Sequence, residues 1–365
     1  MAGRPPVIEI AGVWLPNKGA ELMAHTVVAE LGQRLPGAQF VSLPQGSEAE
    51  RRAIGIPGLV RADRRLERTG LARLRALISP RHVTHVIDIS GFAYGDHWGA
   101  GKARGRAGLH VRAGRPIYLL PQAFGPFDDP ALADEMRTIV KGVRFVAARD
   151  RASRDYLLSL GTGRDVPLLP DITLSLDFAK RTGTGAPFAA LIVNAKTMDG
   201  GQIDEAGLVA LYVRLAALMQ ARGLEPRIVL HEPVADRALS ERIATAAGGI
   251  AIDDLGDARN IKAHLASARI VITGRFHGLA NGLSMGVPSY AISWSHKYGE
   301  LLEDFGRRDA LFAGDADAFC RRVEAELADD TGARRERDRL RGVAQAKKAE
   351  LTGMWDWIAQ DIAAA

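Results

Sequence analysis

The sequence alternates short apolar runs, rich in β-branched residues, with longer segments of helical periodicity, and this alternation constrains the fold more than any other feature. The first half contains the runs VIEIAGV, THVIDIS, PIYLLPQ and RFVAARD, and the second half contains FAALIVNA, RIVLHE, RIVITG and PSYAIS. Strands that alternate with helices form parallel sheets whose faces the helices cover. The chain is therefore predicted to be an α/β protein with parallel sheets.

The length of the chain indicates more than one domain. Its 365 residues, 47% of them hydrophobic, suffice for two domains with full cores. The segment AKRTGTGAP, residues 179–187, is poor in apolar residues and is the predicted boundary. We expect two doubly wound Rossmann-like domains facing a cleft, over residues 1–180 and 181–340, and a C-terminal helix, 341–365, that packs back on the first domain. Because ligands bind at the carboxyl ends of strands in such sheets, the loops after strands should carry the functional residues.

The charge distribution argues against a nucleic-acid partner. The formal net charge is +5, with a local basic excess in RRERDRLRGVAQAKK near the C-terminus. No aromatic residues are interleaved with this run, as a stacking platform for single strands would need. A solvated helix face is the simpler interpretation. Attraction to anionic lipid or to a lipid-linked phosphate stays open.

Cysteine usage and hydropathy indicate the compartment. Cys320 is the only cysteine, so the chain cannot form an intramolecular disulfide or a thiolate metal cluster. The N-terminus lacks the pattern of a secretory signal, and no apolar stretch is long enough for a membrane span. We expect a cytoplasmic protein, and peripheral contact with the inner face of the membrane is left open.

The stretch TGRFHGLANGLSMG, residues 273–286, places Arg275 and His277 at a predicted turn from a strand to a helix that begins near Gly278. The unpaired amides and the partial positive charge at a helix N-terminus favour a phosphate or carboxylate, and an arginine adds a bidentate fork. Histidine is the side chain best suited to proton transfer near neutral pH. We therefore predict an anion site that includes Gly278, with His277 as the proton-transfer residue.

The first predicted turn from a strand to a helix, GVWLPNKGAELM, carries Asn17, Lys18 and Gly19 before a helix expected to begin near Glu21. Lys18 could face an anion and Asn17 a sugar hydroxyl, or the segment could be an ordinary N-capped turn. Both interpretations stay open. The lysine does not have the glycine spacing of a nucleoside triphosphate loop.

Three further strand ends carry candidate residues. The segments DISGFAYGDHWG and LLPQAFGPFDD, the second of which contains Gln122, are typical of loops that hold a sugar, or they are ordinary turns. Arg149 ends the run RFVAARD and is either a second arginine for an anionic ligand or the partner of a neighbouring carboxylate. No spacing of residues matches a zinc or calcium site, and no serine-hydrolase elbow is present.

Taken in order, five segments of this chain resemble the polysaccharide pyruvyl transferase family. They are NKGAELM, LLPQAFGPF, AARDRAS, LLPDITL and GRFHGLANGLSMGVPSYAISWSHKYGELLEDFG. The last segment is the most specific, because it combines Arg-x-His-Gly, a helix of small residues, Gly-Val-Pro and the pair His296–Lys297. The resemblance covers most of the chain.

The resemblance implies a GT-B-like fold and a specific reaction. Characterised members of the family transfer the enolpyruvyl unit of phosphoenolpyruvate to two hydroxyls of a sugar, which gives a pyruvate ketal and releases phosphate. By this resemblance Arg149 and Arg275 bind phosphoenolpyruvate, His277 is the general acid, and His296 and Lys297 join the substrate-binding residues. The route needs no metal and no redox cofactor. The N-terminal domain would then bind the sugar acceptor, whether free, nucleotide-linked, lipid-linked or polymeric, and the C-terminal domain the phosphoenolpyruvate.

Two other functions remain as alternatives. The segment GLSMGVPSYAIS is similar to the donor-site helix of GT-B glycosyltransferases that use a nucleotide sugar. Retaining members of that class usually place a glutamate shortly before this element, whereas this chain has Asn281 and no acid there. A non-catalytic sugar-binding protein on the same fold is the third hypothesis.

Overall fold

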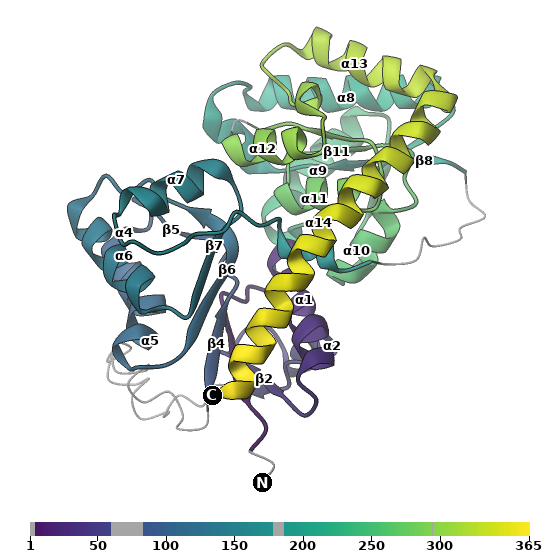
Figure 1. The fold of residues 1–365 in the computed structure, drawn as a ribbon. Helices are drawn as coiled ribbons and strands as arrows, with labels where there is room; N and C mark the ends of the chain where they lie inside the picture. Colours follow the sequence, from purple (N-terminus) through teal and green to yellow (C-terminus); the bar gives the residue numbers. More distant parts are fainter. Residues whose placement is uncertain (1–3, 60–82, 178–185, 294) are drawn as a thin grey trace. The chain divides into compact units, whose positions relative to one another are not determined.

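The computed structural model describes residues 4–59, 83–177, 186–293 and 295–365, and the chain divides into two compact units. Unit 1 comprises Met1–Leu15, Ala20–Ser175 and Ala349–Ala365, and unit 2 comprises Pro16–Gly19 and Leu176–Lys348 (Figure 1). Most of the boundary segment expected at residues 179–187 lies outside the described residues. The short segment Pro16–Gly19 clusters with unit 2, although it lies in the N-terminal half of the chain.

The sheet of unit 1 is parallel, with strand order β3-β2-β1-β4-β6-β5 and with β7 paired to β6. The strands are β1 (Val7–Ala11), β2 (Gln39–Ser42), β3 (Gly58–Leu59), β4 (His85–Asp88), β5 (Phe92–Tyr94), β6 (Ile117–Phe124) and β7 (Phe145–Ala148). Every residue of β4 and β6 is buried, because helices cover both faces of a central parallel strand. This burial fits the apolar centres of these strands, Val86 and Ile87 in β4 and Leu119 and Leu120 in β6.

Helices connect and cover these strands. They are α1 (Lys18–Arg34), α2 (Glu48–Ile54), α4 (Gly99–Ala103), the π-helical η2 (Arg104–Gly108), α5 (Leu109–Arg112), α6 (Pro130–Gly142), α7 (Arg151–Ser159) and the 3-10 turn η3 (Ile172–Ser175). The helix α6 begins where the sequence signals it, since Asp129 caps the amide of Ala131 and Pro130 occupies the first turn. Its apolar face, which includes Met136 and Ile139, packs in the core with β6.

The sheet of unit 2 is also parallel, with strand order β10-β9-β8-β11-β12. Its strands are β8 (Phe188–Ile192), β9 (Glu225–Val229), β10 (Ala251–Asp253), β11 (Val271–Thr273) and β12 (Ser289–Ala291). Its helical segments are η4 (Ala195–Gly200), α8 (Glu205–Ala221), α9 (Pro233–Ala246), α10 (Ala258–Leu265), α11 (Phe276–Ser284), α12 (His296–Asp304), η5 (Arg308–Ala310) and α13 (Ala316–Ala328). The core of this sheet includes Ile192, Val271 and Leu265.

The strand order gives each unit one topological switch point. In unit 1 the chain moves outward from β1 to β2 and β3 and then crosses to β4 on the other side of β1. In unit 2 it moves from β8 to β9 and β10 and then crosses to β11. The predicted α/β fold with two Rossmann-like parts is therefore confirmed. In such sheets the gap between the two diverging connections, at the carboxyl ends of the strands, is where ligands bind.

The last helix, α14 (Asp330–Ala364), ends in unit 1. Trp355 is completely buried there, and its indole Nε1 donates a hydrogen bond to Ser175 Oγ at 3.0 Å. Further along the helix, Asp361 accepts a hydrogen bond from the hydroxyl of Tyr118 and pairs with Arg144. The segment from residue 349 onward is thus an integral part of the first unit, held by both apolar and polar contacts.

Candidate active site

The switch point of unit 2 gathers polar side chains from three strand ends. Asn194 follows β8, His231 and Glu232 follow β9, and Arg275 follows β11. Because parallel strands end at the same edge of the sheet, these residues come together at that edge. Arg275 and His277 were predicted here from the sequence, and the others were not.

Arg275 is the most heavily bonded residue of this group. Its guanidinium donates from Nε and Nη2 to the two carboxylate oxygens of Asp236, at 2.9 and 2.6 Å, and from Nη1 to Glu232. Its backbone amide donates to Thr273 Oγ1 at 2.9 Å. Arg275 is only 8% exposed. The planar fork expected for an anionic ligand is thus held by two carboxylates of this chain, which fix its orientation.

The electrostatics around Arg275 follow from burial. Burial raises the pKa of Asp236, and the pairing with Arg275 opposes that shift. Glu232 is the N-cap residue of α9, yet its carboxylate makes no cap and binds Arg275 instead. The segment HEPVADR places these two acids around a helix start directly after a strand, although it does not reveal that they bond to Arg275.

His277 lies in the first turn of α11, which begins at Phe276, two residues earlier than expected. A Cβ atom on Gly19 would lie 2.0 Å from His277 Nδ1 and 2.5 Å from its Cγ. Only glycine can therefore occupy position 19 while the imidazole keeps this place. The structure thus brings the predicted Gly19 and His277 into direct contact within unit 2.

Asn17 and Lys18, the two residues before Gly19, also make hydrogen bonds within unit 2. α1 begins at Lys18, and not near Glu21 as expected. The Lys18 backbone amide donates to the carbonyl of His231 at 3.2 Å, and Asn17 Oδ1 accepts from the amide of Gly19 at 2.9 Å. The second contact is the capping role that was one of the two interpretations of Asn17.

His231 is one of the residues of this site that sequence reasoning missed. It is 2% exposed, and neither ring nitrogen has a hydrogen-bond partner within the described part of the chain. Burial lowers the pKa of His231 well below its ordinary value, and the charges of His277, Arg275 and Lys18 lower it further. His231 is therefore a neutral imidazole beside His277, at a strand end equivalent to the one that precedes α11.

The turn before Arg275 is held by side chains from two other elements. Asn194 Nδ2 and the hydroxyl of Tyr298 both donate to the carbonyl of Gly274, at 2.7 and 2.9 Å. The Lys297 ammonium lies 5.9 Å from the ring centroid of Phe276 and 5.8 Å from that of Tyr298, within cation–π range. The predicted Lys297 thus contacts the first turn of α11.

Two other predicted residues of unit 2 have simpler surroundings. His296 begins α12 and is exposed. Gly278 is buried, and a Cβ atom there would lie 2.5 Å from Thr273 Oγ1 and 2.8 Å from a methyl carbon of Ile192. Close packing of α11 on its sheet accounts for this glycine.

Of the predicted residues of unit 1, Gln122 is completely buried and Arg149 is partly buried. Arg149 Nη1 donates to Asp171 Oδ2 at 2.8 Å, which is the ion pair considered as its alternative role. Gln122 lies inside β6, and not in a loop, because the strand extends to Phe124. Neither its Nε2 nor its Oε1 has a hydrogen-bond partner among the described residues.

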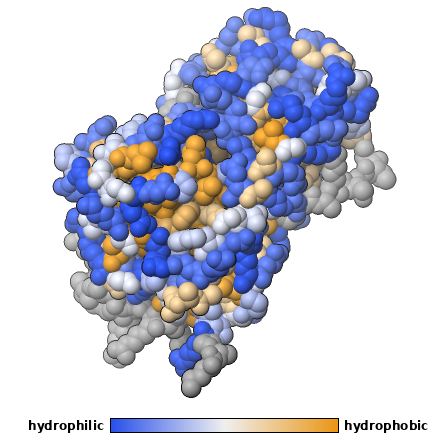
Figure 2. All heavy atoms as spheres, viewed as in Figure 1, coloured by the Kyte–Doolittle hydropathy of each residue, from blue (hydrophilic) through white to orange (hydrophobic). Residues whose placement is uncertain are grey.

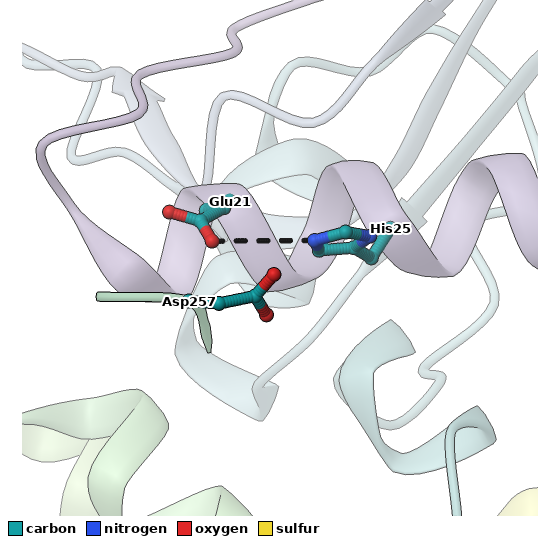
Figure 3. Close-up of side chains that lie close together, drawn as sticks. All are labelled: Glu21, His25 and Asp257. Atoms are coloured by element: carbon teal, nitrogen blue, oxygen red, sulfur yellow. Dashed lines mark ion pairs between the residues drawn. The ribbon is translucent and has the colours of Figure 1, made fainter. Parts of the chain in front are cut away.

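A buried histidine and a glutamate also lie one turn apart on α1. His25 Nε2 lies 4.0 Å from Glu21 Oε1 (Figure 3). Side chains four residues apart on a helix share one face. Local helix geometry therefore accounts for this pair.

A family model described as polysaccharide pyruvyl transferase matches residues 17–296 of the chain. The match spans both candidate regions, from the Asn17–Gly19 turn to His296. No curated protein matches the chain significantly in sequence. Within the described residues, no helix combines the length and the apolar character that a membrane crossing requires.

Solved structures share the fold at low sequence identity. A UDP-GlcNAc 2-epimerase from Neisseria meningitidis bound to UDP-GlcNAc has a TM-score of 0.61 at 10% identity, over 94% of this chain and 98% of its own. The Anabaena protein HepE, in complex with UDP and glucose, has a TM-score of 0.59 at 13% identity, over 99% and 100%. A putative UDP-N-acetylglucosamine 2-epimerase from Listeria monocytogenes has a TM-score of 0.58 at 13% identity, over 93% and 91%. At these identities the likeness concerns the fold alone.

Proposed function

Because the chain belongs to the polysaccharide pyruvyl transferase family, we propose that it transfers pyruvate from phosphoenolpyruvate to a sugar of a cell-surface or exported glycan. The product is a ketal on two sugar hydroxyls, and phosphate is released. The observation that carries the proposal is the position of His277, in the first turn of α11 and two residues after the fixed arginine. An acid and a cationic group at one helix N-terminus suit a substrate with a carboxylate and a phosphate on one enol carbon.

In this proposal His277 is the general acid. It donates a proton to the methylene carbon of phosphoenolpyruvate, which leaves a cationic carbon that a sugar hydroxyl attacks. A second hydroxyl then displaces phosphate. The two hydroxyl protons balance the reaction, since one replaces the proton given by His277 and the other leaves with phosphate. No metal and no redox cofactor takes part.

The charges of the site fit this role of His277. A protonated histidine would be disfavoured by a second cationic imidazole, but burial lowers the pKa of the adjacent His231 so that it stays neutral. The carboxylates of Glu232 and Asp236 both pair with the guanidinium of Arg275 and hold it beside α11. A guanidinium has five N–H groups. The three hydrogen bonds to carboxylates leave two N–H groups that can bind the phosphoenolpyruvate anion.

Phosphate release tests the proposal. The protein is incubated with phosphoenolpyruvate and a panel of acceptor glycans, and phosphate and a pyruvate ketal are measured together. We expect both products in equal amounts with at least one acceptor. Phosphoenolpyruvate that neither binds nor reacts with any member of the panel would contradict the proposal.

The alternative is a glycosyltransferase that uses a nucleotide sugar. The likeness in fold to HepE, solved with UDP and glucose, favours it. Comparing the affinities of phosphoenolpyruvate and common nucleotide sugars separates the two. A glycosyltransferase should bind a nucleotide sugar and release its nucleotide in the presence of an acceptor, with no need for phosphoenolpyruvate.

A further inference from the structure

A pocket of about 550 Å³ opens in unit 1 at the carboxyl ends of β1 and β4, which flank the switch point of this sheet. Its lining includes Glu9 on β1, Asp88 at the end of β4, and Trp14 beyond β1. Lys102 and Arg106 line it from the segment α4–η2. The volume lies within the range of small-molecule sites.

Glu9 contributes a buried carboxyl to the lining of the pocket. It is 4% exposed, and its Oε2 has no hydrogen-bond partner among the described residues. Asp88, in contrast, accepts hydrogen bonds from the Tyr94 hydroxyl at 2.6 Å and from the amide of Ser90 at 2.8 Å. A buried polar atom without a partner is costly, so it usually marks a place that a ligand or water fills. Burial raises the pKa of Glu9 to about 7, which suits hydrogen bonding with a neutral hydroxyl.

Two cations lie on the more exposed wall of the pocket. The Lys102 ammonium lies 3.3 Å from the ring centroid of Trp98, and Arg106 Nη1 donates to Ser90 Oγ at 2.6 Å. Arg106 belongs to the π-helical turn η2 and has non-helical backbone angles, φ −105° and ψ −110°. Such turns interrupt helices frequently at functional sites. The pocket therefore has carboxyl groups at its floor and cations nearer to solvent.

Aromatic side chains flank the same pocket. Trp14 is 51% exposed and Trp98 is 37% exposed. Among the described residues, the large exposed hydrophobic side chains belong to unit 1, with Val234 as the exception. Figure 2 shows the same contrast on the viewed face, where hydrophobic residues gather on unit 1 and unit 2 is mostly hydrophilic. Exposed aromatic rings beside polar groups are typical of surfaces that bind a ligand with both apolar and polar faces.

We propose that this pocket binds the sugar acceptor as a phosphate-linked sugar. The sugar ring packs on the exposed tryptophans, its hydroxyls bond to Glu9, and its phosphate binds Lys102 and Arg106. The inference rests on the proposed function, in which a sugar is the acceptor. A nucleotide-linked and a lipid-linked sugar carry the same glycosyl diphosphate, and the pocket recognises what they share.

Calorimetric binding to the full chain tests the proposal. The probes are free hexoses, hexose 1-phosphates, UDP-linked hexoses and farnesyl diphosphate-linked hexoses. At least one phosphate-linked form should bind about tenfold more tightly than its free hexose, as expected for charge-assisted hydrogen bonds. Lys102→Met and Arg106→Gln should each remove most of that difference. A preference for the UDP or the farnesyl form identifies the source of the acceptor.

Two further variants test the apolar and hydroxyl contacts. Trp14→Ala and Glu9→Gln should weaken binding of the free hexose and of its phosphate by the same factor, because both forms share the ring. Lys141→Met is the matched control, since Lys141 is exposed in the last turn of α6 and does not line the pocket. It should bind every probe as the parent does. If no phosphate-linked sugar binds, or the pocket variants bind like the control, the proposal is wrong.

Binding of phosphoenolpyruvate to the same proteins separates this inference from the proposed function. We expect the pocket variants to bind phosphoenolpyruvate within about twofold of the parent, a change under 0.5 kcal/mol. A parent protein that binds a phosphate-linked sugar but not phosphoenolpyruvate would contradict the proposed function alone. The opposite result would contradict the pocket assignment alone.

Discussion

The switch points of the two units use charge in opposite ways. In unit 2 the charged groups bind one another, since Arg275 bonds to Glu232 and Asp236 and is almost completely buried. In unit 1 a pocket remains open, with the carboxyl of Glu9 at its floor and cations at its wall. The first arrangement fixes side chains in place, as a chemical step requires. The second leaves groups open to a ligand, as the proposed binding of a sugar acceptor would require.

The sharpest test of unit 2 is His277→Ala. If His277 donates the proton, turnover should fall by about 10²- to 10⁴-fold, the usual range for a general acid. The affinity for phosphoenolpyruvate and the melting temperature should change little, because Arg275 and α11 stay in place. Turnover, affinity and melting temperature are measured on the one variant. A loss of stability with turnover near that of the parent would show that His277 packs and does not react.

Arg275→Lys tests whether the ion pairs of unit 2 fix the site. A lysine keeps the charge but cannot bond to both Asp236 and Glu232 with the geometry of a planar fork. We expect most of the activity to be lost and the free energy of unfolding to fall by about 1–3 kcal/mol, the cost of unmade buried hydrogen bonds. Activity assays and thermal melts check both.

The matched control for Arg275 is Arg237→Lys. Arg237 also pairs with an acid, Asp254, but both side chains are more than 40% exposed. Exposed ion pairs contribute little to stability. The free energy of unfolding of this variant should therefore stay within about 0.5 kcal/mol of that of the parent. If Arg275→Lys keeps the activity and the stability of Arg237→Lys, the buried ion pairs of unit 2 do not fix the site.

Gly19→Ala tests the contact between the Asn17–Gly19 turn and the histidine. The added methyl group would lie 2.0 Å from His277 Nδ1, so the imidazole must move. A displacement of about 1 Å in a reacting group can lower turnover by up to about 10²-fold. Gly342→Ala is the control, because Gly342 has open space around its Cα atom within a helix. Equal turnover of the two variants would contradict a working role for this contact.

The sequence predicted the fold, because the alternation of strands and helices carries the pattern of a parallel sheet along the whole chain. It also indicated Arg275, His277 and Gly19, because strand ends and a glycine near a helix start can be recognised from the sequence alone. It could not indicate that Asp236 bonds to Arg275, because that contact joins residues 39 positions apart. His231 and Glu9 were missed for a related reason. A histidine or glutamate inside an apolar run becomes notable only when the structure leaves it buried without a partner.

The smallest expected effect concerns unit 1 and its pH dependence. The pKa of Glu9 is raised to about 7 by burial and by the charge of Asp88, against the opposing charge of Arg115. An acid whose pKa is higher in the folded chain destabilises the fold when ionised, and the penalty is relieved as the pH falls from about 7 toward 4.5.

Glu9→Gln removes the ionisable group and keeps its shape. We expect it to raise the melting temperature by about 2–4 °C at pH 8, corresponding to about 1 kcal/mol, and to change it little at pH 5. Thermal melts at both pH values check this, with Asp134→Asn at an exposed acid as the control. An equal shift at both pH values would mean that Glu9 is already ionised and satisfied, and the contrast with the paired charges of unit 2 would then be lost.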